Sequence, residues 1–408
     1  MLELGKKDIL VLSGEKQTRL TGNSKYSVAV IVHLYYLDTL EYYYNYLNSI
    51  PKEVDVYVTY TSEEQKDIGE KLKNRPIEYI CCENRGRDIS ALLVGARDVI
   101  NKYDYVCFAH DKKAKRKSLV QTTNDWVECL WENTLGGEVY IRNIISQFAE
   151  DEKLGLLAPP LPLDDLNTQF YMGQWGENYQ NVVELAQQIG IKNHIEQNSD
   201  IDVLGTVFWA RTISLKKLLN YDWKYEDFLE EPMPNDGVIS HAVERILPYV
   251  VEDAGYSAKW VMTETYLSMY IHRLRYALTE SYALLDSELG VHTVFEAEHF
   301  KEQANRIIQF VKKCTKKVYI YGAGVYGASC YKILKHYNID VEGFVVTDKN
   351  HAKCYMGKLV WSKEELNWGN VGGIIIAVDS IYRGEIISDI STKCNNFIEF
   401  SRLPDIEK

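Results

Sequence analysis

Ile77-Glu78-Tyr79-Ile80-Cys81, followed after two residues by Asn84-Arg85-Gly86-Arg87-Asp88, is the stretch that decides the fold. Its first five residues have the apolar and aromatic composition of a strand. After the turn, apolar side chains recur at helical spacing on one face, at Ile89, Leu92, Leu93, Ala96 and Ile100. A strand, a charged turn and an amphipathic helix in this order predict an α/β domain.

The turn after this strand concentrates charge and a glycine where strand passes into helix. Arg85 and Arg87 carry planar guanidinium groups, and each can make paired, charge-assisted hydrogen bonds to phosphate oxygens. We therefore predict that the turn, with Asn84, Gly86 and Asp88, binds the diphosphate of a substrate. The alternative is that Asp88 only caps the helix and the two arginines lie in solvent.

A second strand-like run, residues 103–109, leads directly into His110-Asp111-Lys112-Lys113-Ala114-Lys115-Arg116-Lys117. Open α/β sheets bind ligands at the carboxyl ends of their strands. This cationic cluster stands out in a chain with 46 Lys and Arg against 58 Asp and Glu, and it would attract an anionic substrate. We place His110, Asp111, Lys112 and Lys113 at the same substrate site as the arginine turn. The alternative is a solvated basic loop.

Further strand-like and helical runs alternate through the first half of the chain. The strand-like runs are residues 27–34, 54–60 and 154–158, and the helical runs are residues 39–48, 63–73 and 126–148, the last broken at Gly136-Gly137. This order predicts βαβ units and a mostly parallel sheet flanked by helices. Residues 167–198, rich in Gln, Asn, Tyr and Trp, are predicted to cover the mouth of the active site.

Five short motifs follow one another in order over roughly residues 25–275. They are His33-Leu34, Asn84-Arg85-Gly86-Arg87-Asp88, His110-x-Lys112-Lys113, residues 205–211 (Gly-Thr-Val-Phe-Trp-Ala-Arg) and residues 236–245 (Asp-Gly-Val-Ile-Ser-His-Ala-Val-Glu-Arg). In this set the chain resembles the rhamnan synthesis protein F family. The resemblance implies a GT-A-like glycosyltransferase that builds rhamnose-containing cell-surface polysaccharide. It implies a nucleoside-diphosphate sugar as donor, a glycan or lipid-linked glycan as acceptor, and a place for His33 at the donor site.

Asp236 is the predicted general base for an inverting transfer, which needs the acceptor hydroxyl to lose its proton. It follows Pro232-Met233-Pro234-Asn235, which resists helix, and it precedes a run of helical periodicity over residues 237–247. Inverting GT-A enzymes, which the chain resembles, commonly carry an acid at the start of a helix in this region. The alternative role for Asp236 is a helix N-cap.

Three residues are assigned to the acceptor side of the site. Trp209 could stack on an acceptor sugar, Arg211 ends the same strand-like run, and His241 shares a helix with Asp236. His241 could instead belong, with Glu244 and Arg245, to a structural ion-pair group on that helix.

The metal-binding Asp-x-Asp that most GT-A enzymes carry after a central strand is missing here. The corresponding residues are His110-Asp111-Lys112, and one acid beside two lysines is a poor site for a hard divalent cation. We expect no required cofactor, with Lys112 or Lys113 and the two arginines neutralising the diphosphate. Asp111, helped by pyrophosphate oxygens, could still hold Mg²⁺ or Mn²⁺.

The last hundred residues form a separate unit in the predicted architecture. A strand-like run at residues 317–321 leads into Gly322-Ala323-Gly324-Val325-Tyr326-Gly327, and Asp348 follows roughly twenty residues later, in the arrangement of a dinucleotide-binding turn. We predict a half-Rossmann-like domain in which Gly322, Gly324, Gly327 and Asp348 bind a nucleotide, or else a structural or docking module. The predicted boundaries are 1–262 for the GT-A-like domain, 263–312 for a helical connector and 313–408 for this domain.

Bulk properties exclude several classes of function. A formal net charge of −12 argues against nucleic acid or anionic lipid as the main partner. The sequence contains no run of eighteen apolar residues and no signal-peptide pattern, so we expect a cytoplasmic protein, at the inner face of the membrane or away from it. Two functions stay open: a glycosyltransferase, or a non-catalytic nucleotide-sugar-binding scaffold of the same pathway. A redox enzyme built on the carboxyl-terminal glycines is a weaker third.

Overall fold

The structure is a computed structural model that describes residues 8–16, 26–66, 75–114, 120–162, 175–197, 199, 201–234, 236–289, 294–348 and 353–401. The chain divides into two compact units, Met1–Arg273 and Leu274–Lys408. Parts of three predicted stretches, residues 67–73, 115–117 and 167–174, lie outside the described residues.

The first unit is built on an eight-stranded sheet with the strand order β1-β8-β6-β7-β5-β2-β3-β4. The strands are β1 (Ile9–Leu12), β2 (Val28–His33), β3 (Asp55–Tyr60), β4 (Glu78–Cys81), β5 (Tyr105–His110), β6 (Leu154–Ala158), β7 (Phe208–Arg211) and β8 (Ser257–Thr263). Neighbouring strands are parallel except at β7, which is antiparallel to β5 and β6. The prediction of an α/β fold with a mostly parallel sheet is confirmed.

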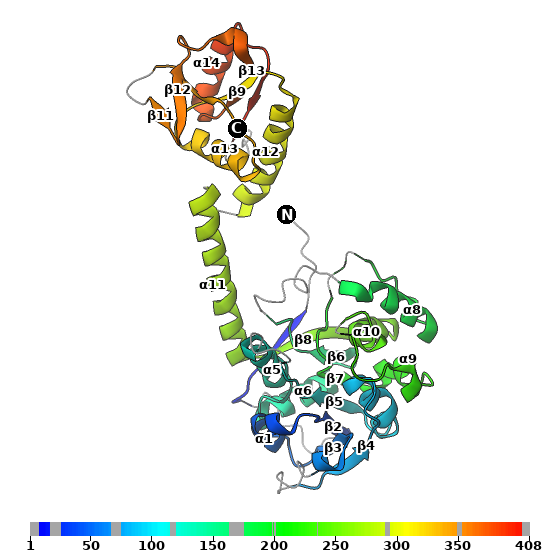
Figure 1. The fold of residues 1–408 in the computed structure, drawn as a ribbon. Helices are drawn as coiled ribbons and strands as arrows, with labels where there is room; N and C mark the ends of the chain where they lie inside the picture. Colours follow the sequence, from blue (N-terminus) through cyan, green and yellow to red (C-terminus); the bar gives the residue numbers. More distant parts are fainter. Residues whose placement is uncertain are drawn as a thin grey trace. The chain divides into compact units, whose positions relative to one another are not determined.

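Helices cover both faces of this sheet (Figure 1). One face carries α1 (Leu40–Asn48), α5 (Val120–Leu135) and α6 (Glu138–Glu150), and the other carries α3 (Arg87–Ser90), α4 (Arg97–Ile100), α8 (Tyr179–Ile189), α9 (Lys216–Leu219) and α10 (Ile239–Asp253). Along β2, Ala29 and Ile31 enter one core while Val30 and Val32 enter the other. Because both faces are buried, the strand reads as one continuous apolar run.

The helix predicted over residues 126–148 is two helices, and the break falls at the predicted glycines. α5 ends at Leu135, and α6 begins at Glu138 after Gly137, whose φ is +136°. A residue with a side chain rarely adopts this φ. The helix predicted after the arginine turn is also divided, into α3, a π-helical turn over Ala91–Gly95, and α4.

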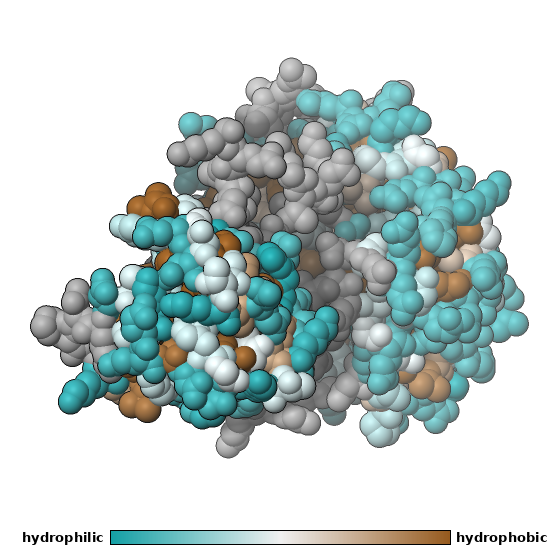
Figure 2. Space-filling view, turned by 90° about the horizontal axis from the view of Figure 1, so that it is seen from above, coloured by the Kyte–Doolittle hydropathy of each residue, from teal (hydrophilic) through white to brown (hydrophobic). Residues whose placement is uncertain are grey.

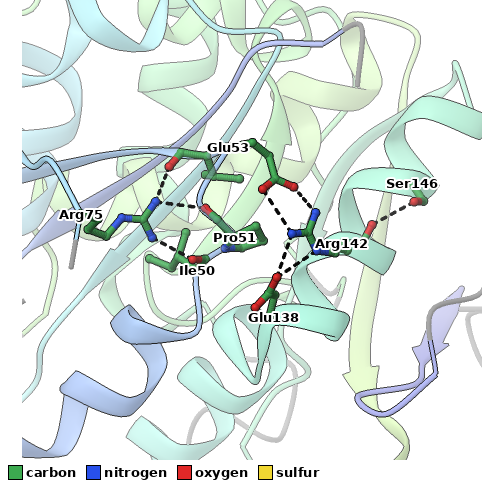
Figure 3. A network of polar contacts seen from close by, with 8 residues as sticks. Ile50, Pro51, Glu53, Arg75, Glu138, Arg142 and Ser146 are labelled. Carbon is green, nitrogen blue, oxygen red and sulfur yellow. Dashed lines mark hydrogen bonds and ion pairs between the residues drawn. The ribbon is translucent and has the colours of Figure 1, made fainter. Parts of the chain in front are cut away.

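A polar network away from the candidate site fixes the turn between α1 and β3 (Figure 3). The Arg75 guanidinium donates to the carbonyl oxygens of Ile50 and Pro51 at 2.9 and 3.0 Å. Arg142 of α6 pairs with Glu53 in this turn and with Glu138 one helical turn earlier. Two arginines thus satisfy carbonyl and carboxylate groups at the start of β3, the end opposite the site.

The second unit contains a six-stranded sheet with the order β11-β12-β10-β9-β13-β14. Its strands are β9 (Lys317–Tyr321), β10 (Gly343–Val346), β11 (Cys354–Tyr355), β12 (Lys358–Ser362), β13 (Val371–Ile376) and β14 (Phe397–Glu399), and its helices include α13 (Val325–His336) and α14 (Ser380–Ile390). All neighbours are parallel except β11 and β12. Two long helices, α11 (Glu264–Leu289) and α12 (Val294–Lys313), occupy the predicted connector, and Ala304 and Ile307 of α12 are buried in the core of this unit.

On the face seen in Figure 2, hydrophobic residues of the coloured part lie in small separate groups among hydrophilic ones. Among the described residues, no helix combines the length and the apolar character needed to cross a membrane.

Candidate functional site

The arginine turn has a backbone that its glycine makes possible. Gly86 has a φ of +72°, and a Cβ there would lie 2.6 Å from the Cβ of Phe228, so neither the backbone nor the space suits a side chain. Arg87 also has a positive φ, +57°, a conformation that costs a non-glycine residue on the order of 1 kcal/mol and is concentrated at functional sites. The N-cap of α3 is Gly86, so Asp88 does not cap the helix.

Both arginines hold the loop of residues 228–234, which leads to Asp236. Arg85 donates from Nε to the carbonyl oxygen of Phe228 at 2.6 Å and pairs with Glu230 at 3.2 Å. Arg87 pairs through Nε with Glu231 at 2.9 Å. The guanidinium of Arg85 thus contacts this loop through Phe228 and Glu230, and we assign Arg85 to holding the loop; diphosphate binding by the turn stays a prediction.

Two histidines lie side by side at the carboxyl ends of neighbouring strands. His33 of β2 and His110 of β5 are register partners. His33 Nδ1 lies 2.8 Å from the Thr59 hydroxyl, and His110 Nδ1 lies 2.9 Å from the Asp111 carbonyl oxygen. Burial lowers the pKa of each histidine to about 4, so both rings are neutral at pH 7.

Asp111 supports a loop instead of facing a ligand. Its Oδ2 accepts hydrogen bonds from the backbone amides of Tyr35 and Tyr36 at 3.0 and 2.7 Å, and the residue is 4% exposed. Burial raises the pKa of this carboxyl to about 7. Among the described residues, no three His, Cys, Asp or Glu side chains are grouped so that they could hold a metal ion. We therefore do not carry Asp111 forward as a metal ligand.

Asp88 and Lys112 place opposite charges close to His110. Oδ2 of Asp88 lies 3.7 Å from His110 Nε2. Burial acts to raise the pKa of Asp88, but His110, Lys112, His33 and the Thr206 hydroxyl outweigh it and hold the pKa below its usual value. Lys112 Nζ lies 4.2 Å from the centre of the Trp126 ring, and burial lowers the pKa of its ammonium group.

Asp236 is held by the segment that precedes α8. Its Oδ2 accepts from the backbone amide of Glu177 at 3.1 Å, and its Oδ1 accepts from Nδ2 of Asn178 at 2.5 Å. Burial acts to raise the pKa of Asp236, but the bonds from Asn178 and Glu177, with the charges of Arg245 and His241, lower it. The N-cap of α10 is Val238, so Asp236 does not cap that helix. Sequence reasoning missed Asn178, which carries no local signal of its role.

The first turns of α10 bring further charged groups to Asp236. His241 Nδ1 and Arg245 Nη2 each lie 3.7 Å from Oδ1 of Asp236. Burial lowers the pKa of His241 to about 4, and the charges of Arg245 and Arg87 act in the same direction. Glu244 is 8% exposed and lies 3.6 Å from Arg245. Ser240 of α10 donates to the Gly86 carbonyl oxygen at 3.3 Å, so the arginine turn packs against the helix whose His241 and Arg245 lie beside Asp236, and these groups form one cluster.

Four predicted residues lie outside this cluster. Trp209 is fully buried and its indole donates to the Thr134 carbonyl at 2.9 Å, so the ring cannot stack on a sugar. Arg211 pairs in register with Tyr105, at the opposite edge of the sheet from His110, and donates to the Phe148 and Asp151 carbonyls. The acceptor assignments of Trp209 and Arg211 are therefore wrong, whereas that of His241 stays a prediction. Lys113 pairs with Asp38, and the exposed Asn84 donates weakly to the Tyr35 hydroxyl at 3.4 Å.

The carboxyl-terminal glycines lie on the turn between β9 and α13. Gly322 has a φ of +116°, and a Cβ at Gly327 would lie 1.9 Å from the Gly322 carbonyl oxygen, so both positions require glycine. A Cβ at Gly324 would meet nothing within 4 Å. Asp348 follows the end of β10. Nucleotide binding by these four residues stays a prediction.

Comparison with known proteins bears on the first unit. The family described as rhamnan synthesis protein F matches residues 5–256, which is more than half of the chain. The chain belongs to the rhamnan synthesis protein F family. Curated relatives include the uncharacterized protein WxcX of Xanthomonas campestris pv. campestris, strains B100 and ATCC 33913, at 26% identity over 236 residues. That alignment covers 56% of this chain and 32% of WxcX, so the chain spans about a third of the length of these relatives.

A structural alignment with the apo-form glycosyltransferase GlyE of Streptococcus pneumoniae TIGR4 covers 90% of this chain and 99% of GlyE. Its TM-score is 0.16 at 12% identity, which is too low to support a shared fold. The family match is therefore the comparison that bears on function, and it concerns the unit that holds the cluster around Asp236.

Proposed function

We propose that this protein is an inverting, GT-A-like glycosyltransferase of polysaccharide synthesis, with a nucleoside-diphosphate sugar as donor and a glycan or lipid-linked glycan as acceptor. One observation carries the proposal: at the carboxyl ends of the strands, a single cluster contains both cations and a carboxylate that is fixed by hydrogen bonds. Arg87 and Lys112 are the cations, and Asp236 is the carboxylate. Membership of the rhamnan synthesis family favours rhamnose or a related sugar as the group transferred.

The diphosphate leaving group would bind to Arg87 and Lys112. A guanidinium fork and an ammonium group stabilise the negative charge that develops as the bond between the sugar and the diphosphate breaks. Arg87 would exchange its ion pair with Glu231 for phosphate oxygens; both of these side chains are about one third exposed, so that pair is weak. Arg85 would keep the loop of residues 228–234 in place. His33 and His110 end neighbouring strands at the same place.

Asp236 would act as the general base. Its low pKa keeps it ionised at neutral pH, and a free lone pair on either oxygen can accept the proton of the acceptor hydroxyl as that oxygen attacks the anomeric carbon. The nucleoside diphosphate leaves from the opposite face, which inverts the configuration. His241 lies beside this carboxylate and would contact the acceptor.

A non-catalytic nucleotide-sugar-binding scaffold is the second candidate. The observation in its favour is that Asp111, the one carboxylate left where most GT-A enzymes have two, is occupied by backbone amides. Both candidates require that the protein binds a nucleotide sugar. A thermal-shift screen with UDP, GDP, dTDP and their sugar conjugates tests this binding, because a ligand of the native state raises the melting temperature. Transfer assays with the conjugate that binds then separate the two: turnover supports the transferase, and binding without turnover on any acceptor supports the scaffold.

A further inference from the structure

His110 carries a buried nitrogen that has no hydrogen-bond partner among the described residues. Nε2 is that atom. On the other side of the ring, Nδ1 lies 2.9 Å from the carbonyl oxygen of Asp111. A carbonyl oxygen only accepts, so Nδ1 carries the hydrogen, and in a neutral imidazole Nε2 then presents a lone pair. The burial of the ring favours this neutral form.

The group that faces Nε2 is a second acceptor. Oδ2 of Asp88 lies 3.7 Å away, and an ionised carboxylate has no proton to donate. Two acceptors therefore face each other: the carboxylate of Asp88 has the Thr206 hydroxyl as a hydrogen-bond partner, whereas Nε2 of His110 has none among the described residues. A buried acceptor left unsatisfied, as Nε2 is, destabilises the folded state, and native proteins keep few such groups. The side chain of Asp88 is 14% exposed, so the pair is not sealed from solvent.

The chemistry of Asp88 and His110 restricts which ligand groups can bind to Oδ2 and Nε2. A diphosphate at neutral pH offers acceptor oxygens and a negative charge, so it would be repelled. A metal ion would need further ligands, and no third His, Cys, Asp or Glu among the described residues completes a site around the pair. Hydroxyl groups have the right character, since each brings one hydrogen to donate.

We propose that Asp88 and His110 form a sugar-recognition pair that accepts hydrogen bonds from two neighbouring hydroxyl groups of the donor's glycosyl residue. Oδ2 of Asp88 takes one hydroxyl and Nε2 of His110 takes the other. The inference rests on the proposed function, and it separates the donor site into two parts. Arg87 and Lys112 bind the diphosphate, whereas Asp88 and His110 bind the sugar, which makes them specificity-determining residues.

The first test is the protonation state of His110. Histidine ¹⁵N NMR of the full chain at pH 7, assigned with a His110→Gln variant, should show a neutral ring with the hydrogen on Nδ1. A doubly protonated ring at pH 7 would mean that His110 and Asp88 form an ordinary ion pair, and this result would overturn the proposal. The outcome does not depend on which nucleotide binds.

The second test is the ratio of the dissociation constant of a nucleoside diphosphate to that of its sugar conjugate, measured by calorimetry. The probes are UDP, GDP and dTDP with UDP-glucose, GDP-mannose and dTDP-rhamnose. His110→Leu should lower the ratio roughly 3- to 10-fold and Asp88→Ala roughly 10- to 100-fold, the scale of neutral and charged hydrogen bonds. His110→Gln, which keeps an acceptor, should recover part of the loss.

Tyr105→Phe is the matched control. It lies on the same strand as His110 but at the other end, where its hydroxyl donates to the Phe148 carbonyl at 3.2 Å. The control should leave the ratio unchanged. Equal weakening of diphosphate and conjugate by both site variants, or an unchanged ratio, would overturn the sugar-recognition pair while leaving the proposed function intact. A parent protein that binds none of the six probes would instead overturn the donor site and this inference with it.

Discussion

Asn178 holds Asp236 with one end of its amide and the following residue with the other. Its Nδ2 donates to Oδ1 of Asp236 at 2.5 Å, and its Oδ1 accepts from the backbone amide of Gly237 at 3.1 Å. Asn178 is fully buried, and Nδ2 also donates to the Trp175 carbonyl at 3.0 Å. A side chain with every polar atom engaged fixes its partner well. Asn178 therefore acts as a positioning residue for the proposed base.

Replacing Asn178 should shift the pH dependence of transfer. In Asn178→Ala, Asp236 loses a hydrogen bond that favours its charged form, while the burial that favours the neutral form remains. Its pKa should rise, so the acid limb of kcat/KM should move to higher pH. Asn181→Ala is the control, because the Asn181 amide donates at 2.9 Å to the Gly237 carbonyl and not to the carboxylate of Asp236. An acid limb in the same place in both variants would show that Asn178 is only structural.

The two arginines of the turn should differ in their effect on ligand binding. Arg87→Ala should weaken binding of the nucleoside diphosphate by about 1.5–3 kcal/mol, the scale of a lost charged hydrogen bond. Arg85→Ala should act mainly on thermal stability, because it frees the loop at Phe228. Calorimetry and melting curves on both variants measure the difference. Equal loss of affinity in the two variants would restore Arg85 to the phosphate clamp.

Metal removal and a lysine variant test how the diphosphate is neutralised. If Lys112 supplies the positive charge, enzyme treated with a chelator should keep most of its activity, and Lys112→Ala should lose it. Activity that disappears with the chelator and returns with Mn²⁺ or Mg²⁺ would contradict this account. Such a result would reopen the carboxylate of Asp111 as a ligand.

Asp111 should make the stability of the protein depend on pH. Its pKa is about 7 in the folded protein and about 3.9 in an unfolded chain, so the native state binds the proton more tightly. The resulting stabilisation is fully present below about pH 4 and is lost as the pH rises through 7, with a ceiling of about 4 kcal/mol. Asp111→Asn should flatten the fall in the free energy of unfolding between pH 5 and 8. The control is Asp222→Asn at an exposed position, which should leave this pH dependence of the free energy of unfolding unchanged. If Asp111→Asn shows the same pH dependence as the parent, Asp111 is not its source.

The elements of the first half could be predicted from the sequence because their signals are local. A buried parallel strand is a continuous apolar run, as in β2 and β5, and the glycine break between α5 and α6 is visible in two residues. The arginine turn was placed correctly between strand and helix for the same reason. Its contacts with Phe228 and Glu231 join residues more than 140 positions apart, and no local pattern reports them.

The places of Trp209 and Arg211 could not be predicted because they depend on the order of the strands. β7 lies between β5 and β6 inside the sheet, so alternate residues enter two different cores and Trp209 has no free face. β7 also runs antiparallel to β5, which carries Arg211 to the edge opposite the site. A strand of four residues gives no sign of its direction in the sheet.

The most direct measurement is the rate of glycosyl transfer by Asp236→Asn, with donor affinity measured on the same preparation. The variant should fold with a near-normal melting temperature, since its amide oxygen can still accept from the backbone of Glu177. Transfer should fall about 100- to 10,000-fold, because a carboxamide cannot take the acceptor's proton. Donor affinity should hardly change, since the base acts on the other substrate in the transition state. A variant that folds, binds the donor and transfers at the parent rate would contradict the assignment of Asp236 as the base.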